Sequence, residues 1–240
     1  MKQFELICTA YLKNNITFKS SFDVISKYIS YSMAQIESFR QLHNQIGFKY
    51  YTFDNFYPIE KDKIYKKGNS YKFTLRSLDE RFIDALSKTL RENINNPNFL
   101  VVETHKKAVK QFFISELYSL TPVIVSVENG MYWSMDKDGD IVKLYNQLHD
   151  NLERKYQSFY NKPINVEQNF IQLLEVKNRY PQSIYMKKNG RDVRFFGNKF
   201  RIVPNEDEIS QKLAFVAMAC GLGEKNSFGG GFCVSRSLNR

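Results

Sequence analysis

The chain has 240 residues and a formal net charge of +10, with 42% hydrophobic and 15% aromatic residues. That hydrophobic content excludes a disordered chain, and the positive excess is typical of proteins that bind a polyanion or an anionic membrane surface. No run of about 18 apolar residues is present, and charges interrupt the first 15 positions, which argues against a spanning helix and a signal peptide.

The first half of the chain predicts the order β-α-β-β-α-β of a ferredoxin-like domain, with an additional hairpin strand. Residues 3–12 alternate apolar and polar side chains, as a strand does. Asp79 is the expected N-cap of the second helix, which ends before Pro97. The predicted strands are 3–12, 48–59, 71–78 and 98–117, the last interrupted by a basic turn at His105, and the predicted helices are 21–43 and 79–97.

The second half repeats this order without repeating its residues. An Asn-Gly pair at 189–190 predicts a hairpin turn, and Leu144, Leu148 and Leu152 form an apolar stripe on one helix. The predicted strands are 122–128, 169–176, 183–203 (folded at the Asn-Gly turn) and 230–236, and the predicted helices are 140–160 and 205–220. We therefore predict an α+β protein of two tandem ferredoxin-like domains, residues 1–120 and 121–240, with a cleft between them.

The C-terminal segment 221–231 is rich in glycine and follows a predicted helix. A dinucleotide-binding loop has the reverse order, with the glycines before a helix, and the Gly-Lys-Ser/Thr of a P-loop is absent from this segment. The pattern therefore argues against a nucleotide cofactor. We expect Gly221 to end the helix in a left-handed conformation, which leaves the other four glycines unexplained.

Three segments resemble a known family. They are "LHNQIGFKYYTFDNFYP" (42–58), "RFFGNKFRIV" (194–203) and "GLGEKNSFGGGFC" (221–233). In this order they are similar to the CRISPR-associated repeat-processing endoribonucleases of the RAMP superfamily. The resemblance implies two ferredoxin-like domains and cleavage of CRISPR repeat RNA in a precursor transcript without a metal. It also implies attack by the ribose 2′-OH, which leaves a 2′,3′-cyclic phosphate and a 5′-OH.

Such a reaction needs a base, an acid and a cation for the phosphoryl charge, and histidine suits either proton step. Three histidines are available: His105 in the expected solvated turn, His149 at an expected surface or boundary position on a helix, and His43 at the end of the first helix. The resemblance assigns catalysis to His43 and stabilisation of the phosphate charge to Lys49. It also implies a tyrosine of the first helix, for which the spacing favours Tyr28 over Tyr31.

Basic residues are concentrated between 171 and 203, with phenylalanines among them, which favours a surface that follows an RNA backbone. The RNA-binding candidates there are Lys187, Lys188, Arg191, Arg194, Lys199 and Arg201. The resemblance adds residues of the glycine-rich loop: Gly223, Lys225, Asn226, Gly229 and Gly231. Residues 61–72 form a second basic segment.

Metal binding has little support in the sequence. The segment 136–140 differs from a calcium loop in the position of its glycine and in Gln147 at position twelve, so we expect a turn, with Asp140 capping the next helix. Cys8, Cys220 and Cys233 show no paired spacing, which predicts reduced thiols in a cytoplasmic protein. We expect no metal and no other cofactor.

Two alternative functions remain open. One is a non-catalytic RNA-binding subunit of a CRISPR effector complex, against which His43 beside Lys49 argues. The other is a basic adaptor for DNA or an acidic protein, although a helix-turn-helix or zinc pattern is missing from the sequence. The expected partners are precursor and product repeat RNA, with other effector subunits and a second copy of the chain as further candidates, and no membrane.

Overall fold

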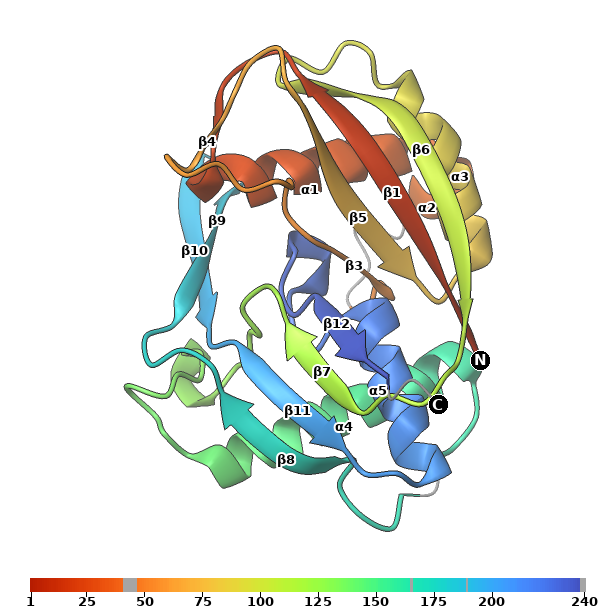
Figure 1. Cartoon of the computed structure of the whole chain (residues 1–240), viewed down its shortest axis with the longest axis vertical. Helices are drawn as coiled ribbons and strands as arrows, with labels where there is room; N and C mark the ends of the chain where they lie inside the picture. The colour runs from red at the N-terminus through yellow and green to blue at the C-terminus, as the bar shows by residue number, and fades with distance from the viewer. Residues whose placement is uncertain (41–46, 165, 189, 238–240) are drawn as a thin grey trace.

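Two antiparallel four-stranded sheets, one from each half of the chain, form the framework of the molecule (Figure 1). The computed structural model describes residues 1–40, 47–164, 166–188 and 190–237. Within these residues, none of the helices has the length and apolar character needed to cross a membrane.

The first sheet has the strand order β3-β5-β1-β6. Its strands are β1 (Lys2–Leu12), β3 (Tyr51–Phe53), β5 (Ser70–Ser77) and β6 (Phe99–Lys110), and the helices of this half are α1 (Phe18–Ala34), α2 (Glu37–Arg40) and α3 (Glu80–Glu92). A short ladder of β2 (Ile16–Thr17) and β4 (Ile64–Tyr65) lies beside it. As the alternation of β1 predicts, Phe4, Leu6 and Cys8 are buried against the helices.

The second sheet has the order β12-β7-β11-β8. Its strands are β7 (Glu116–Ser119), β8 (Ile171–Val176), β11 (Phe200–Pro204) and β12 (Cys233–Arg236), with helices α4 (Ile141–Tyr160) and α5 (Glu208–Cys220) and the short 3-10 turns η1 (Glu128–Gly130) and η2 (Asn226–Phe228). Taken in chain order, the strands of both sheets are arranged fourth, first, third, second across the sheet. This arrangement, antiparallel throughout, confirms the two tandem ferredoxin-like units.

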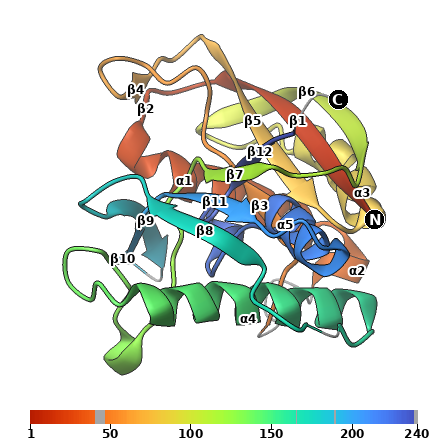
Figure 2. The same ribbon diagram turned by 60° about the horizontal axis from the view of Figure 1, so that its bottom comes forward.

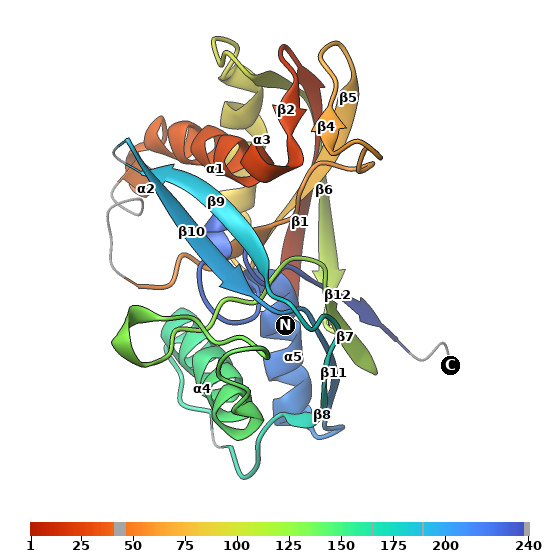
Figure 3. The ribbon, with the colours of Figure 1, turned by 90° about the vertical axis from the view of Figure 1, so that its left-hand side faces the viewer.

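An extra hairpin of β9 (Gln182–Lys188) and β10 (Arg191–Gly197) is inserted between β8 and β11. It leaves the second sheet and lies along α1 of the first half (Figure 3). Ile184, Met186 and Phe195 are buried in the hydrophobic core of the first half. The two halves therefore share part of one core, although each has its own sheet.

The first strand of the second unit is not where the sequence predicted it. Residues 122–128 make only isolated bridges, such as Val123 to Asn198, whereas β7 pairs with β11 and β12. A domain boundary at 120 would cut β7 from its sheet, so the division falls between β6 and β7. The periodicity of a short run does not specify its partner strand, because pairing depends on distant residues.

Two other predictions about elements are corrected. The first helix starts at Phe18, capped by Thr17, and ends at Ala34, whereas the sequence predicted one helix over 21–43; its buried face includes Ile25 and Ile29. The basic turn expected at His105 is absent, because β6 continues through it and His105 pairs with Ile7 of β1. The predicted caps Asp79 and Asp140 are confirmed, each accepting hydrogen bonds from the first turn of its helix.

Figure 2 shows α4 lying across the base of the second unit, where it packs against both β8 and α5. Leu144, Leu148 and Leu152 of α4 are fully buried, as their spacing predicted. All three cysteines are unpaired and buried, in agreement with the expected free thiols.

Candidate functional site

A cavity of about 360 Å³ lies between the two halves of the chain. From the first half, residues 47–51 line it; from the second, α4 contributes Asn151 and Lys155, and the glycine-rich loop contributes residues 223–228. Three segments that are distant in sequence therefore meet here, and two of them carry the family resemblance.

Lys49 of the first half lies in this cavity and is partly buried. Burial lowers its pKa, and the nearby charge of Lys188 at the tip of the hairpin lowers it further. His43 lies outside the described residues, but the segment that contains it leads into Gly47, which lines the cavity. The structure thus brings the predicted Lys49 and the glycine-rich loop to one site, with the charge of Lys188 nearby.

The cavity wall contains a buried lysine that sequence reasoning missed. Lys155 is 2% exposed, and its Nζ donates to the carbonyl oxygens of Gly221 (2.7 Å) and Gly223 (2.8 Å) and to Asn226 Oδ1 (2.8 Å). Burial lowers the pKa of this amine to about 8. All three ammonium hydrogens are thus used to hold the loop.

The sequence contained one signal for this role. Lys155 follows Leu152 by three residues on the stripe Leu144–Leu148–Leu152, at a position where an apolar residue would continue the buried face. A lysine there indicates a buried partner for its charge. Asn151, which also lines the cavity, is 7% exposed, and its Oδ1 has no hydrogen-bond partner among the described residues.

The conformation of the loop explains why it is rich in glycine. Gly229 has φ +89, and a Cβ there would lie 2.4 Å from the ring of Phe22. Gly231 has φ +67, and its Cβ would lie 1.9 Å from the Leu222 carbonyl oxygen. The absence of a Cβ at Gly229 and Gly231 lets the loop backbone pack closely against Phe22 and Leu222, and this packing alone explains why glycine occupies both positions. Contact of Gly223, Gly229 and Gly231 with RNA stays a prediction.

The structural roles of two further loop residues follow from their conformation and contacts. Gly221 ends α5 with φ 83 as expected, but its ψ of 152 is extended and not that of a left-handed helical residue. The side chain of Asn226 is used inside the loop: its Nδ2 donates to the carbonyl oxygens of Leu222 and Gly230, and its Oδ1 accepts from Lys155. Asn226 therefore shapes the loop instead of offering its amide to a ligand.

Tyr28 occupies the hydrophobic core and not the cavity. It is 0% exposed, its hydroxyl donates to the Leu90 carbonyl oxygen (2.7 Å) and accepts from the Val101 N–H (3.1 Å), and its ring stacks on Phe99. This position is incompatible with the predicted catalytic role, since the hydroxyl has no surface to meet a substrate. Tyr31, about one turn further along α1, is 54% exposed.

The other two histidines differ in environment. His105 is exposed on β6. His149 is 8% exposed, so it is more deeply buried than the expected surface or boundary position; its Nδ1 accepts from the Phe170 N–H at 3.1 Å and its ring stacks on Phe170. Ligand atoms of His149, Asp150 and Glu153 lie within 4.8 Å of one another. His149 Nδ1 is already bonded to the backbone, however, and acidic side chains on adjacent helical turns are common without a metal.

The basic candidates of the hairpin are exposed. Lys187, Lys188, Arg191 and Arg194 are accessible on β9 and β10, while Lys199 beside them is partly buried. Arg194 Nε donates to Ser183 Oγ (2.8 Å), and its guanidinium lies 5.9 Å from the ring of Tyr185. Within the described residues, none of these five cations forms an ion pair, so their charge is available to an anion.

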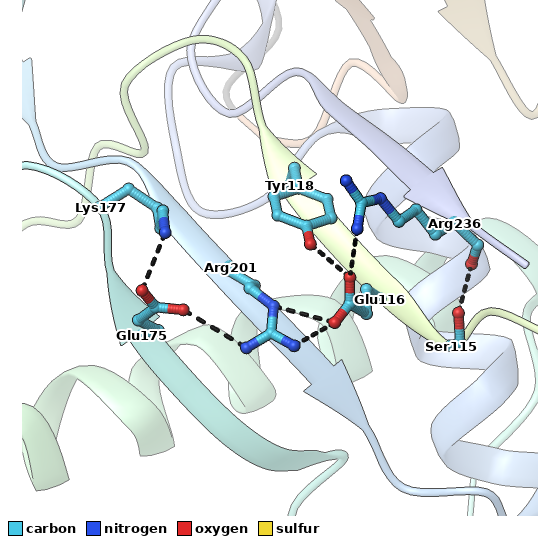
Figure 4. A network of polar contacts seen from close by, with 7 residues as sticks. All are labelled: Ser115, Glu116, Tyr118, Glu175, Lys177, Arg201 and Arg236. Carbon is cyan, nitrogen blue, oxygen red and sulfur yellow. Dashed lines mark hydrogen bonds and ion pairs between the residues drawn. The ribbon is translucent and has the colours of Figure 1, made fainter.

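Arg201 is the exception among these candidates. Figure 4 shows its guanidinium between Glu116 of β7 and Glu175 of β8, and Tyr118, Lys177 and Arg236 extend the network. The hydrogen-bonded carboxylate of Glu116 raises the pKa of Arg201, and the hydrogen bonds from Arg201 and Tyr118 lower the pKa of Glu116. The ion pairs of Arg201 thus link strands β7, β8 and β11 of the second sheet. Because its charge is already neutralised by these carboxylates, we do not retain Arg201 as an RNA contact.

Lys225 has φ 57, and its Nζ lies 3.9 Å from Glu224 and 5.8 Å from the centre of the Phe195 ring. Glu224 is itself held by the N–H and the hydroxyl of Ser126. The loop thus presents one cation, Lys225, close to the hairpin.

Comparison with known proteins agrees with this geometry. A family model described as "CRISPR associated protein Cas6, C-terminal" matches residues 104–234. The CRISPR-associated endoribonuclease Cas6 2 of Methanocaldococcus jannaschii is 30% identical over 241 residues, covering 92% of this chain and 97% of its own. Two solved structures share the fold: a CRISPR associated protein Cas6 (TM-score 0.69, 22% identity, 98% of this chain and 100% of that one) and a RAMP protein described as binding different RNA substrates (TM-score 0.70, 17% identity, 98% and 100%). Because these matches extend over both sheets and include the glycine-rich loop, the chain belongs to the Cas6 family, as its three motif segments indicated.

Proposed function

We propose that this chain is an endoribonuclease that cleaves CRISPR repeat RNA in a precursor transcript. The observation that carries the proposal is the meeting of Lys49, the segment leading from His43 and the glycine-rich loop around one cavity between the two units. The relative named as a Cas6 endoribonuclease, which aligns with nearly the whole chain, supports the same activity.

In the proposed mechanism the RNA supplies its own nucleophile. The ribose 2′-OH attacks the adjacent phosphorus, the bond from phosphorus to the 5′-oxygen breaks, and the products carry a 2′,3′-cyclic phosphate and a 5′-OH. His43 transfers a proton at the 2′-oxygen or the leaving 5′-oxygen. Lys49, partly buried and poorly hydrated, stabilises the charge that develops on the phosphoryl oxygens. No step requires a metal.

Single-turnover cleavage of the host's repeat RNA tests this proposal. We expect His43→Ala to lower the rate by about 10²–10⁴-fold with binding nearly unchanged, because the contribution is to proton transfer. Lys49→Ala should lower the rate less. A 2′-deoxy ribose before the scissile phosphate should block cleavage, and excess EDTA should not.

His105→Ala is the matched control, since His105 is exposed on β6. His149 does not serve as a control, because its ring is buried and hydrogen-bonded. Cleavage by His43→Ala at the wild-type rate, or loss of activity in EDTA with recovery in magnesium, would contradict the proposed mechanism. Tight binding with no cleavage by the wild-type chain would favour the non-catalytic RNA-binding subunit.

A further inference from the structure

A second cavity, with a volume of about 700 Å³, lies where the first sheet, residues 120–122 and the base of the hairpin meet. It shares no lining residue with the first cavity. Strand β3 joins the two, because Tyr51 lines the first and Asp54, just after the strand, lines the second. Three residues of extended chain span ~10 Å, so these two lining residues lie a short distance apart along the chain.

The lining of this cavity is rich in unpaired positive charge. Lys63, Arg194 and Lys199 line it, and none of them forms an ion pair within the described part of the chain. Burial lowers the pKa of Lys199, and the charge of Lys63 lowers it further. An anion bound among these side chains would relieve their mutual repulsion.

Aromatic rings accompany these cations. Phe18, Tyr57 and Tyr185 line the cavity, and Tyr57 is 70% exposed. The Nζ of Lys63 lies 5.3 Å from the centre of the Phe18 ring, and that of Lys19 lies 4.4 Å from the Tyr185 ring. An exposed tyrosine ring beside unpaired cations is the combination on which single-stranded nucleic acid stacks a base and places its phosphates.

The cavity also contains polar groups able to distinguish one base from another. Asp54 is the only acid among its described lining residues, and its Oδ1 accepts from the Thr74 N–H at 2.5 Å. Asn55 is 9% exposed, with Oδ1 accepting from the Phe56 N–H and with no hydrogen-bond partner for Nδ2 among the described residues. A carboxylate acceptor beside an amide donor matches the edge of a base that offers both an amino group and an acceptor.

We propose that this second cavity holds one unpaired nucleotide of single-stranded RNA. Its base stacks on the exposed ring of Tyr57, with Asp54 and Asn55 at the base edge, and Lys63, Arg194 and Lys199 hold the flanking phosphates. The inference rests on the proposed function, because the nucleotide belongs to the same repeat RNA whose scissile bond enters the first cavity. An acidic peptide could pair with the cations, but its carboxylates would not stack on the aromatic ring, so RNA is the better match.

An abasic scan tests the proposal. The probe is repeat RNA with a 2′-deoxy ribose at the scissile site, in which each base in turn is removed, and the measurement is the dissociation constant. In the wild-type chain we expect one or two adjacent abasic positions to weaken binding about 5- to 100-fold, the range that stacking gives. Tyr57→Ala should bind intact RNA more weakly and show no further loss at those positions, whereas Tyr57→Phe should behave as wild type.

Tyr180→Ala is the matched control, because Tyr180 is 67% exposed and does not line this cavity. Identical abasic profiles for Tyr57→Ala and wild type would overturn the proposal. So would wild-type RNA binding by Tyr57→Ala together with lost affinity for polyglutamate, which would identify an acidic protein segment as the ligand. The probe cannot be cleaved, so a failure of the scan is separate from a failure of the proposed catalysis, which the His43 and 2′-deoxy experiments measure.

Discussion

At the scale of single residues, two ionisable side chains lie in surroundings that oppose their charge. Burial lowers the pKa of Lys155 to about 8 and raises that of Asp54 to about 7. Each lines one of the two cavities. Perturbed pKa values of this kind are concentrated at functional sites, and each gives a measurable consequence.

Lys155→Met should destabilise the chain by about 2 kcal/mol. The substitution leaves the carbonyl oxygens of Gly221 and Gly223 and the Oδ1 of Asn226 without their donor, and an unsatisfied buried acceptor costs about 1–3 kcal/mol, partly offset by removal of a buried charge. Urea denaturation measures the change. Lys162→Met, at an exposed position just after α4, should have little effect. Equal stability of the two variants would show that Lys155 does not hold the loop.

Asp54→Asn should stabilise the chain at pH 8 more than at pH 5. A carboxyl whose folded pKa is about 7, above its unfolded value near 4, contributes stability at low pH that is lost as the pH rises through 7. The asparagine variant lacks this loss, so the difference in unfolding free energy should grow by about 1–3 kcal/mol between pH 5 and pH 8. Urea unfolding at the two pH values measures it, and a constant difference contradicts the raised pKa.

At the scale of elements, the hairpin β9–β10 has two faces with different roles. Ile184, Met186 and Phe195 anchor it in the core of the first half, while Tyr185 and Arg194 face the second cavity. Its tip carries Lys188 and Arg191, which are paired across the turn, and Lys188 is near enough to Lys49 to lower its pKa. The hairpin therefore contributes positive charge near both cavities, through Lys188 at the first and Arg194 at the second.

Lys188→Ala combined with Arg191→Ala should weaken RNA binding and reduce its dependence on salt. Each phosphate contact to a single strand contributes about 0.7 to the slope of log affinity against log salt, so the loss of two contacts should reduce the slope by about 1.4. Binding titrations at several salt concentrations measure it. Lys88→Ala with Arg91→Ala on α3 removes the same charge from another exposed surface. If both double variants change the slope equally, net charge is responsible and not the hairpin.

At the scale of the whole molecule, the two units are joined by polar contacts as well as by the shared core. Arg76 of β5 is 8% exposed. It forms an ion pair with Glu5 (2.9 Å), donates to the Cys233 carbonyl oxygen (2.5 Å) and lies over the Phe232 ring. This one side chain connects the first sheet to the segment that follows the glycine-rich loop.

Arg76→Ala should cost about 3–5 kcal/mol of stability, because it leaves Glu5 as an uncompensated, largely buried charge. Arg81→Ala is the control, since the Arg81 side chain is 93% exposed. Urea unfolding followed by far-ultraviolet circular dichroism measures both. A loss below 1 kcal/mol for Arg76→Ala would mean that the interface does not depend on this residue.

The sequence by itself determined most of the secondary structure and the tandem fold. The alternation in β1, the stripe Leu144–Leu148–Leu152 and the caps Asp79 and Asp140 are local patterns that the structure confirms. Such patterns depend on neighbours within a few residues, where helix and strand geometry is fixed. The motif segments also indicated the family and made Lys49 a candidate site residue, and the structure places Lys49 in the cavity between the two units.

Only the tertiary structure decided which strands pair, which face of α1 is buried and where charge is held. β7 belongs to the second sheet, Tyr28 lies in the core, Arg201 is paired with carboxylates, and Lys155 lies beneath the loop. Each of these facts depends on residues far away in the sequence, such as Glu116 for Arg201 and Gly223 for Lys155. A residue's type and spacing specify what chemistry it can do, but its burial and partners come from the packing of distant segments, which no local pattern contains.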